Sequence, residues 1–202
     1  MNVTGRERLV VNVGCGPRGG ALPPHFQGWR ELRVDVDAAV EPDIVADLTD
    51  LTAIAAGSAD AVWASHCVEH LYAHQVPAAL AQFRRLLRED GFACLIVPDL
   101  QTVAQQVAAD RMHEILYHSH SGPITPHDVM FGYGAAIAAG HAAMAHRCGF
   151  TPGVLQQYFH DGLFAEVVLR RRAREFELAA VAWANPAASD AERAAVLNAL
   201  VP

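Results

Sequence analysis

Residues 9–16 read Leu-Val-Val-Asn-Val-Gly-Cys-Gly, and two further glycines follow at positions 19 and 20. A short apolar run that stops at glycine is typical of a strand that is buried on both faces and leads into a tight turn. Glycine also lets the backbone approach a bound molecule closely, because no Cβ stands in the way. We therefore expect a strand over residues 9–13 and a ligand-binding loop at Gly14, Cys15 and Gly16.

Apolar runs of strand length recur through the first half of the chain. They cover residues 32–36, 44–46, 61–64 and 92–97. Apolar residues at helical spacing cover 76–87 and 100–108, and Asp90-Gly91 would end the first of these helices. Strands that alternate with helices in this way predict a Rossmann-like α/β fold with a doubly wound, mostly parallel sheet.

A segment early in the second half of the chain has no regular pattern of apolar residues. Residues 112–140 are rich in histidine and glycine, and Pro123 and Pro126 interrupt them. Loops that cover substrates often have this composition. We therefore expect a lid or substrate segment there.

Regular structure returns after this segment. Residues 151–162 open with Thr-Pro and close with glycine, which predicts a helix. Strand-like runs at 163–169 and 176–181 predict an antiparallel hairpin, and the arginine-rich residues 170–174 would form its solvated connection. A capping-box pattern at 189–192 predicts a short tail helix.

The composition fits one soluble, cytoplasmic domain. The 202 residues are 52% hydrophobic and 18% charged, which suits a single core and is short for two. The net charge of −7 argues against nucleic acid and anionic membranes as partners, because both attract dense basic patches. Four cysteines without a Cys-x-x-Cys pair, and no signal-peptide or membrane-spanning run, favour a reducing compartment. The sequence leaves open whether the chain forms a homodimer.

Acidic residues follow the second and third predicted strands. Asp35 ends the second strand, where its carboxylate could accept hydrogen bonds from two ribose hydroxyls, and the glycine spacing also matches a dinucleotide site. A pyrophosphate would need the N-terminus of a helix after the loop, but prolines and glycines at 17–24 leave no room for a long one. Asp47 could accept from an adenine amino group. These features favour S-adenosylmethionine over a dinucleotide, and a turn that merely needs glycine is the third interpretation.

The order of these motifs resembles that of a known family. Residues 9–16, 33–37 (Arg-Val-Asp-Val-Asp), 43–48 (Asp-Ile-Val-Ala-Asp-Leu), 65–71 (Ser-His-Cys-Val-Glu-His-Leu) and 85–91 (Arg-Leu-Leu-Arg-Glu-Asp-Gly) carry the likeness. The set is similar to class I S-adenosylmethionine-dependent methyltransferases, most of all to a bacterial branch related to the type 11 methyltransferases. The resemblance is strongest over about residues 9–100 and implies a seven-stranded sheet whose last strand is antiparallel. With the length of the chain, we expect a single domain over residues 1–202.

The resemblance implies roles for the glycine loop and the acid that follows it. Gly14, Cys15 and Gly16 would offer backbone groups to the methionine part of the cofactor. Asp35 would hold the ribose, with Asp37 as a substitute.

The resemblance extends to the later motifs. Asp47 and Leu48 would meet the adenine ring, and Ser65 and His66 would line the edge of the cofactor pocket. Asn12 departs from the pattern, because many members of the family carry an acid there. An amide brings no charge, which puts a role for Asn12 in cofactor binding in doubt.

The chain has 11 histidines, so a metal site must be considered. Residues 66–70 read His-x-x-Glu-His, a zinc-hydrolase signature, but that chemistry needs a continuous helix and His66 directly follows a strand. We therefore expect no metal site. The candidate general bases are His66, His70 and His127, with backbone-bonded or loop histidines as the alternative. Methyl transfer by positioning alone would need no base.

These expectations combine into one interpretation. The chain would be an enzyme that transfers a methyl group from S-adenosylmethionine to an oxygen or nitrogen of a small, for example sugar-like, molecule, leaving S-adenosylhomocysteine. Residues 112–140 would cover the acceptor. The alternatives are an NAD(P)-dependent oxidoreductase and a non-catalytic module that binds S-adenosylmethionine.

Overall fold

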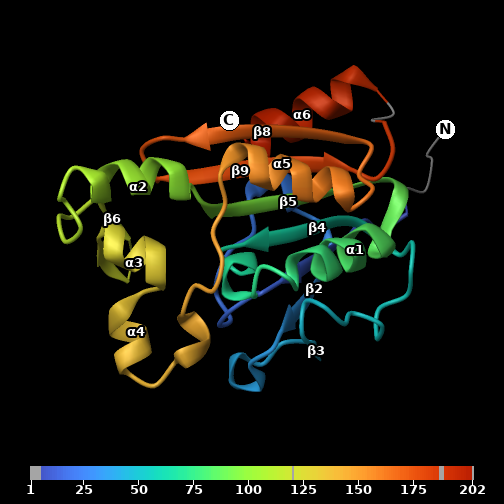
Figure 1. Ribbon diagram of the computed structural model, residues 1–202. Coiled ribbons are helices and arrows are strands. Elements are labelled where there is room, and N and C mark those ends of the chain that lie inside the picture. Colours follow the sequence, from blue (N-terminus) through green and yellow to red (C-terminus); the bar gives the residue numbers. More distant parts are fainter. Residues whose placement is uncertain (1–5, 120, 187–188, 202) are drawn as a thin grey trace.

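The structure is a computed structural model that describes residues 6–119, 121–186 and 189–201. A seven-stranded sheet has the order β3-β2-β1-β4-β5-β9-β8 (Figure 1). Its strands are β1 (Leu9–Val13), β2 (Arg30–Asp35), β3 (Ile44–Val45), β4 (Ala59–Ser65), β5 (Leu87–Pro98), β8 (Glu166–Arg172) and β9 (Glu177–Trp183). Strands β1 to β5 run parallel, and β9 is antiparallel to both β5 and β8. The predicted sheet, with its antiparallel C-terminal hairpin, is confirmed.

Helices cover both faces of the sheet. On one face, α1 (Val76–Leu86) and α5 (Pro152–Asp161) pack their buried side chains against the strands. On the other face lie α6 (Asp190–Leu200) and the 3-10 turn η1 (Pro24–Phe26), whose Phe26 is buried. Burial on both faces explains why the central strands read as continuous apolar runs.

The connection from β1 to β2 lacks a long helix, as the prolines and glycines predict. Among the described residues it contains only η1, and the connection from β2 to β3 contains only the 3-10 turn η2 (Ala38–Val40). Helix α6, from the C-terminal end of the chain, contacts η1 and packs on the same face. A helix from the end of the sequence therefore covers the part of the sheet that the short connections leave open.

Helix α1 ends earlier than the turn signal suggests. It stops at Leu86, and Leu87 already has extended backbone angles. Leu87 pairs with Ala59 of β4, so the sheet begins before Asp90-Gly91, which lie inside β5. The predicted helix end at Asp90-Gly91 was wrong because strand pairing overrides the local preference for a turn.

Residues 112–140 are more regular than predicted. They form the hairpin β6 (Tyr117–Ser119) and β7 (Gly122–Ile124) and the short helices α3 (Pro126–Phe131) and α4 (Gly134–Ala138). Thr125 caps α3 in a capping box, so the proline at position 126 opens this helix instead of breaking structure. This segment and the helix α2 (Leu100–Ala108) lie beyond the carboxyl ends of the parallel strands (Figure 1).

The arginine run also differs from its prediction. Arg170, Arg171 and Arg172 lie in β8 and not in a solvated connection. Arg171 Nε lies 2.9 Å from Asp99 Oδ2, and Arg172 donates a hydrogen bond of 3.0 Å to the carbonyl of Leu200. These arginines therefore fasten β8 to the start of α2 and to the end of α6.

The remaining helix predictions are confirmed. Thr151 caps α5 and Gly162 ends it, and Ser189 caps α6 by accepting from the N–H of Glu192. Within the described residues, none of the helices combines the length and the apolar character needed to cross a bilayer.

Candidate functional site

The two glycines of the loop after β1 serve different purposes. Gly14 and Gly16 both have left-handed backbones, with φ of 64° and 59°. A Cβ on Gly14 would overlap the Cβ of Cys67, so this glycine is needed for packing between the loops after β1 and β4. A Cβ on Gly16 would meet nothing within 4 Å. Gly16 therefore presents an open side from which a ligand can approach the backbone.

Asp35 lies beside this loop, as the sequence predicts. Its Oδ2 accepts a hydrogen bond of 2.9 Å from the N–H of Gly16, and its Oδ1 accepts one of 3.0 Å from the N–H of Asp37. The guanidinium group of the buried Arg33 donates hydrogen bonds to the carbonyls of Gly16 and Glu41. Each oxygen of the Asp35 carboxylate keeps acceptor capacity for a ligand hydroxyl, because a carboxylate has about four lone-pair sites. Asp35 thus holds the loop in place and can still accept hydrogen bonds from a ligand.

The other two acids near this end of the sheet have local partners. Asp37 accepts from the N–H of Ala39 and caps η2, so its side chain is already engaged. Asp47 Oδ1 accepts from the N–H and hydroxyl of Thr49, at 2.8 and 2.6 Å. Asp47 is exposed and follows β3. Because β3 pairs in parallel with β2, Asp47 and Asp35 both lie at the carboxyl ends of these strands.

The residues expected at the margins of the cofactor pocket fall into two groups. Leu48 is buried in the main core. Ser65 and His66 line a pocket of about 490 Å³ together with residues 21–24 and the end of α6. Asn12 donates a hydrogen bond of 2.7 Å to Glu31, so the position that departs from the family pattern has a partner within the sheet.

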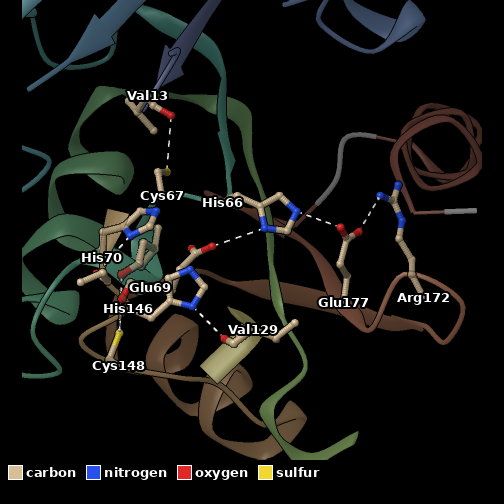
Figure 2. Close-up of polar contacts among 12 residues, drawn as sticks. Val13, His66, Cys67, Glu69, His70, Val129, His146, Cys148, Arg172 and Glu177 are labelled. Atoms are coloured by element: carbon tan, nitrogen blue, oxygen red, sulfur yellow. Dashed lines mark hydrogen bonds and ion pairs between the residues drawn. The ribbon is translucent and has the colours of Figure 1, made fainter. Parts of the chain in front are cut away.

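His66 forms the centre of an ion-pair network at the end of β4 (Figure 2). Its backbone is left-handed, with φ of 51°, so the residue leaves the strand in a turn and not in a helix. Its Nε2 lies 2.8 Å from Glu177 Oε1, and its Nδ1 lies 3.3 Å from Glu69 Oε1. Arg172 approaches the other side of Glu177 at 3.5 Å.

The charge on His66 changes the role expected for it. Burial would lower its pKa, but the carboxylates of Glu177 and Glu69 outweigh burial and raise the pKa to about 10. The ring is therefore an imidazolium at neutral pH. A protonated ring can orient and stabilise negative charge but cannot accept a proton, so the predicted role of His66 as a general base does not suit this environment.

A second histidine group lies next to this network. The ring centroids of His70 and His146 are 5.0 Å apart, and the buried carboxylate of Glu69 lies beside them (Figure 2). His70 Nδ1 faces the carbonyl of Ala145 at 3.3 Å, and His146 Nδ1 faces the carbonyl of Val129 at 2.8 Å. Burial lowers the pKa of His146. His146 follows the segment that was predicted to cover the acceptor.

These groups line one cavity, which we call the histidine pocket. It has a volume of about 390 Å³, and its walls include His66, Glu69, His70, Tyr117, Tyr133 and His146. The pocket lies between the carboxyl ends of the parallel strands and the segment of residues 117–146, where ligands bind in open α/β sheets. A pocket of this size suits a small molecule.

His127 does not belong to this pocket. His127 is exposed, and its ring stacks on that of His113, with centroids 5.6 Å apart, and lies tilted against Phe131 at 5.1 Å. The structure thus brings His66 and His70 together and places His127 apart from them.

Sequence reasoning missed Glu177 and His146. Glu177 begins β9, and His146 follows the predicted lid by a few residues. Neither stands in a motif, and both reach the pocket through the order of the strands. The only signal in the sequence was that charged or titratable residues stood at the ends of apolar runs.

Comparison with known proteins agrees with this geometry. Residues 11–95 match a family model described as a methyltransferase domain. A search of curated protein sequences gives no match to the chain.

Several solved structures share the fold. An N1-methyltransferase of Burkholderia thailandensis, with bound 1,6-didemethyltoxoflavin and S-adenosylhomocysteine, is 18% identical over 89% of this chain and 72% of that chain, with a TM-score of 0.55. A SAM-dependent methyltransferase of Methanosarcina mazei is 12% identical over 87% of this chain and 91% of that chain, with a TM-score of 0.58. The methyltransferase domain of the citrinin polyketide synthase is 11% identical over 90% of this chain, with a TM-score of 0.55, and this chain spans 48% of its length.

At these identities the solved structures establish the fold, and the family model establishes the kind of domain. Both agree with the motif order and with the position of Asp35 beside the glycine loop. Residues 11–95 are therefore similar to a methyltransferase domain, and the chain has the fold of the solved S-adenosylmethionine-dependent methyltransferases.

Proposed function

We propose that the chain transfers a methyl group from S-adenosylmethionine to an oxygen or nitrogen of a small molecule held in the histidine pocket. The observation that carries this proposal is the contact between the two sites. Cys67 packs on Gly14 of the cofactor loop, and the preceding residue, His66, lines the histidine pocket. A cofactor on the loop and an acceptor in the pocket would therefore be neighbours.

The cofactor, when bound, supplies a methyl group activated by a sulfonium centre. Asp35 would hold the ribose, Asp47 and Leu48 would meet the adenine, and the backbone of the loop would face the methionine part. His66 would keep its proton and orient the acceptor, and the proton that the methylated oxygen or nitrogen loses would pass to solvent. Most of the rate would then come from placing the two reactants together. An acceptor with hydroxyl groups, such as a sugar-like molecule, would find donors and acceptors in His66, Tyr117 and Tyr133.

Two kinds of measurement test this proposal. Calorimetry should show one S-adenosylhomocysteine per chain and no heat from NAD(H). Incubation with methyl-labelled S-adenosylmethionine and a panel of small hydroxyl and amino compounds should give labelled product and S-adenosylhomocysteine in equal amounts. Binding of NAD(H) alone would favour the oxidoreductase alternative. Tight cofactor binding without transfer to any acceptor would favour the non-catalytic module.

A further inference from the structure

The group formed by Glu69, His70 and His146 has the composition of a metal site. Each of the three residues offers one ligand atom, and these atoms lie within 4.8 Å of one another. Two imidazoles and one carboxylate are a common ligand set for divalent transition metals. Composition alone would not justify a site, so the partners of each group are decisive.

The hydrogen bonds of the two rings set their protonation. The Nδ1 atoms of His70 and His146 both face backbone carbonyls, those of Ala145 and Val129 (Figure 2). A carbonyl oxygen only accepts, so each Nδ1 must carry the proton and donate it. In the neutral ring the lone pair then lies on Nε2, where a metal can bind. Histidines that bind metals are commonly oriented in this way by their second nitrogen.

The buried carboxylate of Glu69 has an ion-pair partner, His66, but no hydrogen bond from the described residues. Glu69 is only 1% exposed, and within the described part of the chain neither oxygen accepts a hydrogen bond. Its one charged neighbour is His66, at 3.3 Å from Oε1. Burial of a carboxylate costs several kcal/mol unless it is paired and hydrogen-bonded. His66 offsets part of this cost, and a cation among Glu69, His70 and His146 would offset more of it by binding an oxygen that accepts no hydrogen bond.

The backbone holds the three ligands in position. The carbonyl of Glu69 accepts hydrogen bonds from the N–H groups of Arg147 and Cys148, at 2.9 and 3.2 Å. The N–H of His146 donates to the carbonyl of Phe131 at 3.1 Å. The turn that carries Glu69 and His70 is thus fastened to the segment that carries His146, as a preorganised site requires.

The geometry points to a site at which Glu69, His70 and His146 bind one divalent transition-metal ion, for which Zn²⁺ is the test case. Ions such as Mg²⁺ and Ca²⁺ prefer oxygen ligands and fit two imidazoles poorly. His66 is not a ligand, because both of its ring nitrogens face carboxylates. This differs from the expectation of no metal site, since the His-x-x-Glu-His signature would have paired His70 with His66 and not with the distant His146.

The position of the metal site suggests that the metal binds the acceptor. All three ligands line the histidine pocket. Three protein ligands leave at least one coordination position of Zn²⁺ open, and that position would hold a donor oxygen or nitrogen of the bound molecule. This use rests on the proposed methyl transfer, whereas metal binding itself does not.

Metal binding can be measured on the full chain without cofactor or acceptor. After treatment with a chelator, calorimetry with Zn²⁺ should show one tight site per chain. His146→Ala and Glu69→Gln should weaken binding by on the order of 100-fold or more, since each removes a direct ligand. His74→Ala is the matched control and should leave zinc affinity unchanged, because His74 is exposed, stacks on Tyr72 and is not part of the histidine pocket. Circular dichroism would show that each variant folds.

X-ray absorption of the zinc-loaded wild-type chain provides a test that needs no variant. It should show two imidazole nitrogens and oxygen ligands around the metal. Absence of a stoichiometric site in the wild type, a metal shell without imidazole, or an unchanged affinity in a folded His146→Ala variant would each overturn the inference. Zinc binding at this site without methyl transfer would uphold it and contradict only the proposed function.

Discussion

The cofactor loop and the histidine pocket lie side by side, but they are assembled across very different distances along the chain. Gly16, in the loop after β1, and Asp35, at the end of β2, are hydrogen-bonded to each other and are 19 positions apart. His66 and Glu177, which are bonded at the pocket, are 111 positions apart and meet because β9 inserts beside β5. The first arrangement follows from one strand–turn–strand unit. The second exists only once the whole sheet has formed, so the two regions should respond differently to mutation.

Gly14→Ala should have the largest effect and should act on stability. The new Cβ would strain a left-handed backbone and overlap Cys67, so we expect unfolding free energy to fall by about 3–4 kcal/mol. Gly16→Ala, with the same backbone but open space, should lose about 1–2 kcal/mol. Urea unfolding of both variants measures the difference. Equal losses would show that the contact with Cys67 plays no part, and that Gly14 does not link the loop to the pocket.

Asp35→Ala should affect cofactor affinity more than stability. Loss of charge-assisted bonds to the ribose should weaken S-adenosylmethionine by roughly 2–3 kcal/mol in calorimetry. Asp37→Ala is the control, because Asp37 only caps η2, and it should weaken the cofactor by less than about 0.5 kcal/mol. An affinity that falls only in Asp37→Ala would assign the ribose to the other acid.

In contrast to Asp35→Ala, His66→Gln should slow the reaction and leave cofactor affinity nearly unchanged. The amide can donate to Glu177 but carries no charge, so kcat/KM should fall about 20-fold, while S-adenosylhomocysteine binds within about twofold of the wild type. His127→Gln should leave both quantities unchanged, since His127 is exposed and its ring contacts His113 and Phe131, outside the histidine pocket. A larger loss in His127→Gln than in His66→Gln would move the acceptor out of the histidine pocket.

The same contrast explains how much the sequence could predict. The order of apolar runs and turns predicts the sheet, and the spacing from Gly16 to Asp35 predicts the cofactor side, because both are local. The protonation of His66 depends on Glu177, which no motif marks, so the sequence could not show that the pKa of this candidate base is raised. His146 was missed for the same reason. The regular structure within residues 112–140 was missed in part because Pro126, which begins a helix, looks like a proline that breaks one until the cap at Thr125 is seen.

The opposite end of β4 offers the smallest effect and a useful contrast with His66. Asp60 lies at the start of the strand, far from both sites, and accepts hydrogen bonds of 2.8 Å from Arg6 and from the N–H of Leu9. Burial alone would raise its pKa, but these bonds outweigh burial and hold the pKa below its ordinary value. Asp60 therefore stabilises the fold only while it is ionised.

The sign of the pH dependence follows from that shift. A carboxyl whose pKa is lower in the folded chain contributes its stability above its unfolded pKa of about 3.9 and loses it as the pH falls through the folded value. We expect Asp60→Asn to remove about 1 kcal/mol of unfolding free energy at pH 7 and almost none near pH 2, with cofactor affinity unchanged. Urea unfolding across this range, with calorimetry at pH 7, measures both quantities. A loss that persists at pH 2 would mean that the substitution disturbs packing instead of removing a useful charge, whereas a loss confined to higher pH separates the stabilising end of β4 from its functional end.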